Sequence, residues 1–141
     1  MSVKCFVDTN ILVYAHDTSA GTKHNVASAL IERHWQDANA SISVQVLQEF
    51  YVSLRRKVTA LAPSAARELV ALYGRWRTFQ PEASDVLAAI DLHQENQLSF
   101  WDAMIVIGAA RLGCDLIYSE DMNSGQAILG VKIVNPFAQS S

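Results

Sequence analysis

The stretch Val-Lys-Cys-Phe-Val-Asp-Thr-Asn-Ile-Leu-Val-Tyr-Ala, residues 3–15, places a short polar segment between two apolar runs. Residues 3–7 are mostly apolar and are typical of a short buried strand, and residues 11–15 continue as an apolar helical turn. Between them, Asp8, Thr9 and Asn10 follow the strand directly. Asp8 is therefore either a turn residue that ends the strand or part of a reaction centre.

Outward from this stretch, short apolar runs alternate with segments of helical spacing. Strands are predicted at 40–43, 78–81 (an edge strand, since it ends in proline), 115–119 and 131–134. Helices are predicted at 23–35, 44–57, 63–77, 84–95 and 99–112, with Ser84 and Ser99 as N-caps and Gly113 as a C-terminal stop. This alternation predicts an α/β fold in which helices cover both faces of a parallel sheet.

Length and composition predict one domain spanning residues 1–141. Half of the 141 residues are hydrophobic and 18% are charged, which favours a dense core over disorder. No apolar run approaches the roughly 20 residues of a membrane span, and the start does not resemble a signal peptide, so we expect a cytoplasmic protein. Cys5 and Cys114 lie in apolar runs without metal-site spacing and are predicted to be reduced core residues.

The net charge of −3 argues against broad, non-specific binding of nucleic acid. It leaves room for a local basic patch beside an acidic pocket. Arg55, Arg56 and Lys57 form the one tight basic run, which we interpret as a solvated helix end because cations are favoured near a helix C-terminus.

Four carboxylates fall at corresponding places in the predicted sheet. Asp8 follows the first strand, Asp121 follows the strand at 115–119, Glu49 lies one turn into the helix after strand 40–43, and Asp102 lies in the first turn of the helix capped by Ser99. Ligands of open α/β sheets bind beyond the carboxyl ends of the strands. If the sheet is parallel, the four carboxylates converge on one pocket at that edge.

Taken singly, each residue has a structural explanation. Asp8 could form an Asx turn, and Asp102 could form a capping box with Ser99. Glu49 could be a solvated charge near the start of its helix, although the residues beside it in the sequence are mostly apolar. Asp121 could be a helix cap or a turn residue. Taken together, they would be a repulsive cluster that raises its own pKa values. A hard divalent cation such as Mg²⁺ relieves this repulsion, and it favours hydrolysis of a phosphodiester by an activated water.

The segments VDTNILVYA, VLQEF, FWDAMI and YSEDM resemble, in this order, the PIN-domain ribonucleases, and most closely the VapC-type toxins of toxin–antitoxin modules. The resemblance implies a compact α/β/α sandwich, a Mg²⁺ or Mn²⁺ site, an RNA substrate, a homodimer and a cognate antitoxin. By position, Asp8, Glu49, Asp102 and Asp121 match the acidic residues, with Asp8 and Asp102 as the firmest metal ligands. Thr9, Asn10 and Ser119 match the supporting polar positions, and Glu120 competes with Asp121 for the fourth acidic place.

The predicted function is a metal-dependent endoribonuclease, and Asp8→Asn should abolish RNA cleavage without unfolding the chain. Two alternatives stay open: a non-catalytic RNA-binding or regulatory module, and an aspartate-nucleophile phosphatase. The phosphatase is disfavoured because enzymes of the haloacid-dehalogenase type need an acid where this chain has Asn10. Trp101 is interpreted as packing against the sheet, and of the histidines only His16 is placed to approach the pocket.

Overall fold

A computed structural model describes residues 3–138 of the chain. Within that range the strands form one six-stranded sheet in the order β3-β2-β1-β4-β6-β5. All neighbouring strands are parallel except β5, which runs antiparallel to β6. The strands are β1 Cys5–Val7, β2 Ala40–Ser43, β3 Arg77–Phe79, β4 Leu116–Tyr118, β5 Ala127–Ile128 and β6 Val131–Val134.

Strand β1 lies inside the sheet, between β2 and β4. Its three residues Cys5, Phe6 and Val7 are fully buried, as expected for a parallel strand that is covered on both faces. The chain builds β2 and then β3 on one side of β1 before it crosses to β4 on the other side. The carboxyl ends of β1 and β4 therefore lie where the strand order reverses, which is the position where open α/β sheets bind ligands.

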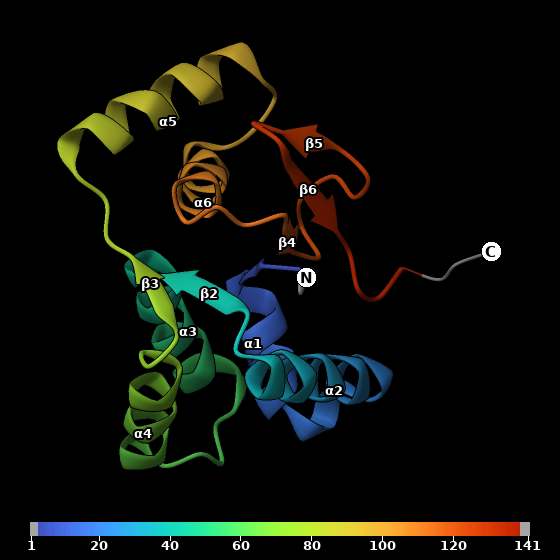
Figure 1. Cartoon of the computed structure of the whole chain (residues 1–141). Helices are drawn as coiled ribbons and strands as arrows, with labels where there is room; N and C mark the ends of the chain where they lie inside the picture. The colour runs from blue at the N-terminus through green and yellow to red at the C-terminus, as the bar shows by residue number, and fades with distance from the viewer. Residues whose placement is uncertain (1–2, 139–141) are drawn as a thin grey trace.

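Helices cover both faces of the sheet (Figure 1). One layer contains α1 Thr9–His16, α2 Thr22–Asp37, α3 Val44–Lys57 and α4 Pro63–Tyr73, with the short 3-10 turn η1 Thr18–Ala20 between α1 and α2. The opposite layer contains α5 Ala83–Glu95 and α6 Phe100–Arg111. The predicted three-layer α/β/α sandwich with a short central parallel sheet is confirmed.

Helix α6 is the buried helix of its layer. Residues 103–109 are all buried, because the sheet lies beneath this helix and α5 packs over it. At Gly108 the helix approaches β3 so closely that an added Cβ would lie 2.8 Å from Cδ2 of Phe79. This contact fixes the distance between α6 and the edge of the sheet.

Several predicted boundaries differ from the structure. The first helix begins at Thr9 because Asp8 caps it. The helix predicted to reach residue 77 ends at Tyr73, because Arg77 already pairs with Ser41 of β2 as part of β3. Ser84 is not the N-cap of α5. Glu82 holds that position, and its backbone N–H donates to the Asp85 carboxylate at 2.9 Å.

Strand β5 is absent from the prediction. Its two residues join β6 through Leu129 and Gly130, which both have positive φ angles, of 52° and 79°. Tight hairpin turns of this kind usually contain Asn-Gly or Asp-Gly, so a leucine at the first position hides the turn in the sequence.

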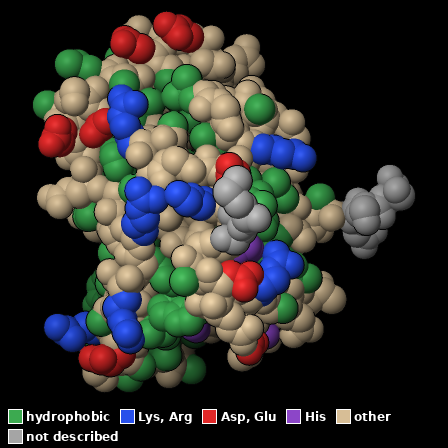
Figure 2. All heavy atoms as spheres, viewed as in Figure 1, with side chains coloured by type: hydrophobic (Ala, Val, Ile, Leu, Met, Phe, Trp, Pro, Cys, Tyr) green, Lys and Arg blue, Asp and Glu red, His purple; other side chains and the backbone are tan. Residues whose placement is uncertain are grey.

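The surface carries mixed charge. On the face seen in Figure 2, basic and acidic side chains are interspersed and no broad basic surface is visible. None of the helices in residues 3–138 has both the length and the apolarity to cross a membrane. Cys5 and Cys114 are buried free thiols, as predicted.

Candidate active site

A small polar cavity lies at the carboxyl ends of β1 and β4. It has a volume of about 240 Å³, and its walls include all four predicted carboxylates: Asp8, Glu49, Asp102 and Asp121. They come from the end of β1, from α3, from the start of α6 and from the segment after β4. The fold therefore brings together residues up to 113 positions apart in the chain, as the parallel-sheet argument predicts.

Asp8 is the most buried of the four, with 5% of its surface exposed. Its backbone N–H donates to the Tyr118 carbonyl at 3.0 Å, which extends the β1–β4 ladder by one residue. One carboxylate oxygen accepts from the Thr9 N–H at 2.7 Å, and the other accepts from the Ser119 hydroxyl at 2.7 Å. The isolated interpretation of Asp8 was an Asx turn; in the structure Asp8 is the N-cap of α1, and it also lines the cavity.

Asn10 connects the two strand ends that form the cavity. Its Nδ2 donates to Asp121 at 3.0 Å and lies 3.5 Å from Oδ2 of Asp8, while its Oδ1 accepts from the Glu120 backbone N–H at 3.3 Å. One amide side chain therefore sets the position of the segment after β4 relative to Asp8.

Glu49 is held by two polar neighbours. One carboxylate oxygen accepts from the Thr9 hydroxyl at 3.1 Å, and the other accepts from Nε2 of Gln45 at 2.9 Å. The sequence predicted few polar neighbours for Glu49, and this prediction is wrong. Gln45 lies one helical turn before it, and the Thr9 side chain of α1 also contacts it.

Asp102 has its backbone in a helix cap and its carboxylate at the cavity. The Ser99 hydroxyl accepts from the Asp102 backbone N–H at 3.0 Å, which is half of the predicted capping box. Among the described residues, the returning bond from the Ser99 N–H to the Asp102 carboxylate is not formed. The carboxylate instead faces the cavity.

Glu120 and Asp121 lie on different sides of their segment. Asp121 lines the cavity, whereas Glu120 accepts from the Tyr14 hydroxyl at 2.7 Å and pairs with the Lys23 ammonium of α2. Burial alone would raise the pKa of Glu120, but the bonds from Lys23 and Tyr14 hold it below its ordinary value. The geometry thus places Asp121, and not Glu120, beside the other three carboxylates.

The crowded carboxylates perturb one another. The pKa of Asp8 is raised to about 6: burial raises it most, the hydrogen bonds from Ser119 and Thr9 lower it, and the charges of Asp102 and Glu49 add a smaller rise. The pKa of Asp102 is also raised, first by burial and then by the charges of Asp121 and Glu49. A strongly perturbed acid in a cleft is a frequent mark of a functional site.

Comparison with protein families gives one match. A family model described as PIN domain matches residues 5–125, which contain all four carboxylates. The chain belongs to the PIN-domain family.

Two solved structures share the fold of this PIN domain. VapC20 of Mycobacterium tuberculosis, described as a Sarcin-Ricin loop cleaving toxin, is 22% identical, with a TM-score of 0.64 over 84% of this chain and 90% of that one. A toxin-antitoxin complex from Klebsiella pneumoniae contains a chain that is 19% identical, with a TM-score of 0.68 over 95% of this chain and 98% of that one. Comparison with curated protein sequences gives no match.

The donor set of this PIN domain suits a hard divalent cation. Its four carboxylates offer only oxygen ligands, the kind that Mg²⁺ and Mn²⁺ prefer. In residues 3–138, no three acidic, histidine or cysteine side chains lie close enough together to enclose an ion as they stand. None of the ion pairs in this range neutralises any of the four carboxylates. An added cation would therefore offset the burial and the mutual repulsion that together raise the pKa values of Asp8 and Asp102.

Sequence reasoning missed the basic wall of the cavity. Ser53, Arg56 and Lys57 line it. They follow Glu49 by four, seven and eight residues respectively, so all four lie on one face of α3. The run at 55–57 does end the helix as predicted, but two of its three cations also line the cavity of the carboxylates. The helical spacing from Glu49 was the signal that could have identified them.

One aromatic prediction is wrong, and one possibility is not realised. Trp101 is not packed against the sheet, because 61% of its surface is exposed and it forms part of the cavity wall. His16 does not approach the carboxylates. Its Nε2 lies 2.6 Å from the Tyr73 hydroxyl, in a separate hollow between α1, α2 and α4. His16 ends α1, whereas Asp8 caps its start, so the helix separates His16 from the carboxylates by about two turns.

Proposed function

We propose that this PIN domain is a metal-dependent endoribonuclease and the toxin of a toxin–antitoxin pair. One observation carries the proposal: four carboxylates from four separate elements line one small cavity that is also lined by Arg56 and Lys57 of α3. Carboxylates that take part in none of the ion pairs of residues 3–138 suit a divalent cation, and the neighbouring Arg and Lys suit the phosphates of a nucleic acid.

Asp8 and Asp102 are the proposed direct ligands of Mg²⁺ or Mn²⁺, since they are the two carboxylates whose burial most disfavours an uncompensated charge. The bound ion would supply charge stabilisation at the phosphoryl oxygens and lower the pKa of water. Thr9, Asn10 and Ser119 are proposed to support the site, because each holds a carboxylate by a hydrogen bond.

The chain's own groups then account for the remaining chemistry. Glu49 and Asp121 are placed to orient a water and accept its proton as it attacks phosphorus in line. The bond from phosphorus to the leaving ribose oxygen breaks, and that oxygen takes a proton from solvent water, while the proton of the attacking water stays on the carboxylate that accepted it until it passes to solvent. Arg56 and Lys57 are placed to hold the non-bridging oxygens of the same or the next phosphate.

The toxin assignment rests on the two structural neighbours, one a toxin that cleaves the sarcin-ricin loop and the other a member of a toxin-antitoxin complex. By this assignment the protein acts in the cytoplasm, forms a homodimer and is inhibited by a cognate antitoxin.

The test is cleavage of total RNA by the purified protein in Mg²⁺, in Mn²⁺ and in EDTA, with the cut sites mapped by sequencing. We expect cleavage only with the metal, and a loss of at least about 100-fold for Asp8→Asn, Asp102→Asn and Asp121→Asn. Asp91→Asn, at an exposed position on α5, is the matched control and should cleave as the wild type does.

Three outcomes would contradict the proposal. Full cleavage by Asp8→Asn or in EDTA would refute the metal mechanism. RNA binding without cleavage under all metal conditions would favour the non-catalytic module. Trapping of an aspartyl-phosphate on Asp8 would favour the phosphatase.

A further inference from the structure

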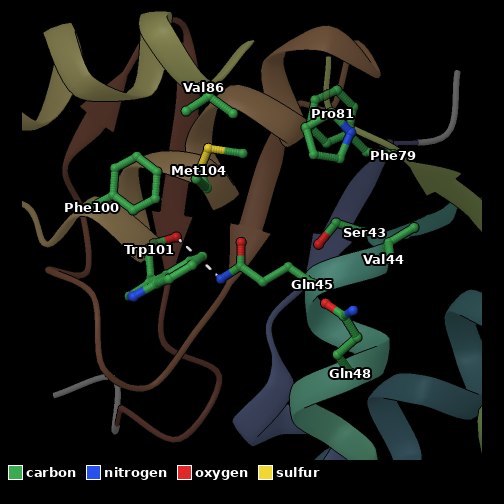
Figure 3. A pocket seen from close by; sticks show the side chains of 10 residues that line it. All are labelled: Ser43, Val44, Gln45, Gln48, Phe79, Pro81, Val86, Phe100, Trp101 and Met104. Carbon is green, nitrogen blue, oxygen red and sulfur yellow. Dashed lines mark hydrogen bonds between the residues drawn. The ribbon is translucent and has the colours of Figure 1, made fainter. Parts of the chain in front are cut away.

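A second, apolar cavity lies beside the acidic one. It has a volume of about 380 Å³, within the range of about 300–1,000 Å³ typical of small-molecule sites. Its walls come from the start of α3, the end of β3, α5 and α6 (Figure 3). The apolar side chains that shape it are Phe79, Pro81, Val86, Phe100, Trp101 and Met104.

The two cavities share a boundary formed by Gln45 and Trp101, which line both. Nε2 of Gln45 lies 2.9 Å from Oε1 of Glu49 and 3.4 Å from the Trp101 carbonyl, and Figure 3 shows the second contact. Trp101 also directly precedes Asp102 in the chain. A polymer whose phosphate lies among the carboxylates therefore has its neighbouring unit at the mouth of the apolar cavity.

The chemistry of the walls suits a flat group with apolar faces and a polar edge. The indole of Trp101 is exposed, although large aromatic side chains are usually buried in a monomer. The amides of Gln45 and Gln48 lie on the α3 side of the cavity; the Gln45 nitrogen is engaged by Glu49 and Trp101, and the Gln48 amide carries both a hydrogen-bond donor and an acceptor. Stacking on aromatic side chains with hydrogen bonds to the base edge is how proteins bind unpaired nucleobases.

We propose that this cavity takes the nucleobase of the nucleotide next to the scissile phosphate, with Trp101 as the stacking surface and Gln48 as a group that reads the base edge. The inference rests on the proposed ribonuclease function. It implies that the substrate is cleaved in a single-stranded or locally opened region, because a paired base is not free to enter. Trp101 and Gln48 are thus specificity residues and not catalytic ones.

The test uses a short single-stranded RNA that contains the mapped cut site, and two copies of it in which the nucleotide on one or the other side of the cut lacks its base. Trp101→Ala should lower kcat/KM on the intact RNA about 5- to 150-fold, the range of base-stacking losses. On the RNA that lacks the bound base, the wild type should be slowed by a similar factor, and Trp101→Ala should add no further loss.

Two further variants separate recognition from folding. Trp101→Phe keeps an aromatic face and should recover most of the activity. Gln48→Ala should change the preference among the four bases at that position. Leu87→Ala, at an exposed leucine of α5 outside the cavity, is the control and should behave as the wild type does. Circular dichroism of each variant shows whether it is folded.

Each result bears on the proposal. If the wild type cleaves this RNA and Trp101→Ala cleaves it equally well, or if the losses from Trp101→Ala and base removal multiply, the nucleobase site is refuted while the nuclease stands. If the wild type cleaves no RNA, both fall. A last outcome would assign the cavity to an interface between two copies of the chain. In that case Val86→Asp would convert a dimer to a monomer in sedimentation, Trp101→Ala would not affect cleavage, and the proposal would be overturned.

Discussion

Asp8→Asn in the metal-free protein tests whether the buried charge of Asp8 lowers the stability of the folded chain. The folded pKa of Asp8 is about 6, and its ordinary value is 3.8. Between these two pH values the folded chain holds a proton that the unfolded chain has released. The free energy of unfolding therefore falls as the pH rises through this window, and the loss is complete above about pH 6.

The magnitude follows from the same pKa values. They differ by roughly two, and each pKa unit corresponds to about 1.4 kcal/mol, so ionising Asp8 costs the folded state about 3 kcal/mol. Asparagine is neutral, is a good N-cap and can still accept from the Thr9 N–H. Asp8→Asn should thus be more stable than the wild type by up to about 3 kcal/mol at pH 7.5, and equal to it near pH 4.

The assay is urea unfolding of both proteins in EDTA at several pH values from 4 to 7.5, followed by circular dichroism. The difference in unfolding free energy between the two proteins at each pH reports on Asp8 alone, because the other groups that titrate in this range are present in both. Asp91→Asn serves as the control for loss of an exposed carboxylate. Adding Mg²⁺ should raise the stability of the wild type more than that of Asp8→Asn, since the ion binds the folded state.

One result would refute this reasoning: a difference in unfolding free energy between Asp8→Asn and the wild type that stays constant from pH 4 to 7.5. A variant that is less stable at every pH would show that the hydrogen bonds of Asp8 outweigh its buried charge.

Three further predictions concern neighbours of the site. Ser119→Ala removes the hydroxyl that donates to Asp8 and should lower the free energy of unfolding by about 1–3 kcal/mol at pH 7.5, measured by urea unfolding; no change would mean that water replaces the bond. Gly108→Ala places a Cβ against the Phe79 ring and should cost about 1–3 kcal/mol, seen as a lower Tm; an unchanged Tm would show that the ring yields freely. Glu120→Gln should keep RNA cleavage, since Glu120 faces Lys23, whereas Asp121→Asn should lose it; the opposite pattern in a cleavage assay would make Glu120 the fourth acid.

The sequence by itself determined the fold class and brought four carboxylates to one candidate site. Short apolar runs alternating with helical segments allow few arrangements other than a parallel sheet covered by helices, and parallel strands all end at one edge. Asp8, Glu49, Asp102 and Asp121 could be assigned to that edge because each follows a strand or begins a helix. The position of a residue relative to its own strand or helix is a local property, which does not depend on contacts with distant parts of the chain.

The tertiary structure decided what depends on the direction of a side chain and on its distant neighbours. Glu120 and Asp121 are adjacent in sequence, and only the position of Lys23 on α2 shows which of them turns away from the cavity. Trp101 belongs to a mostly buried helix, yet it is exposed because α6 presents its first turn between the two cavities. The apolar cavity itself has no sequence signal, since it arises where α3, β3, α5 and α6 meet, and a space between four elements is not encoded in the spacing of any one of them.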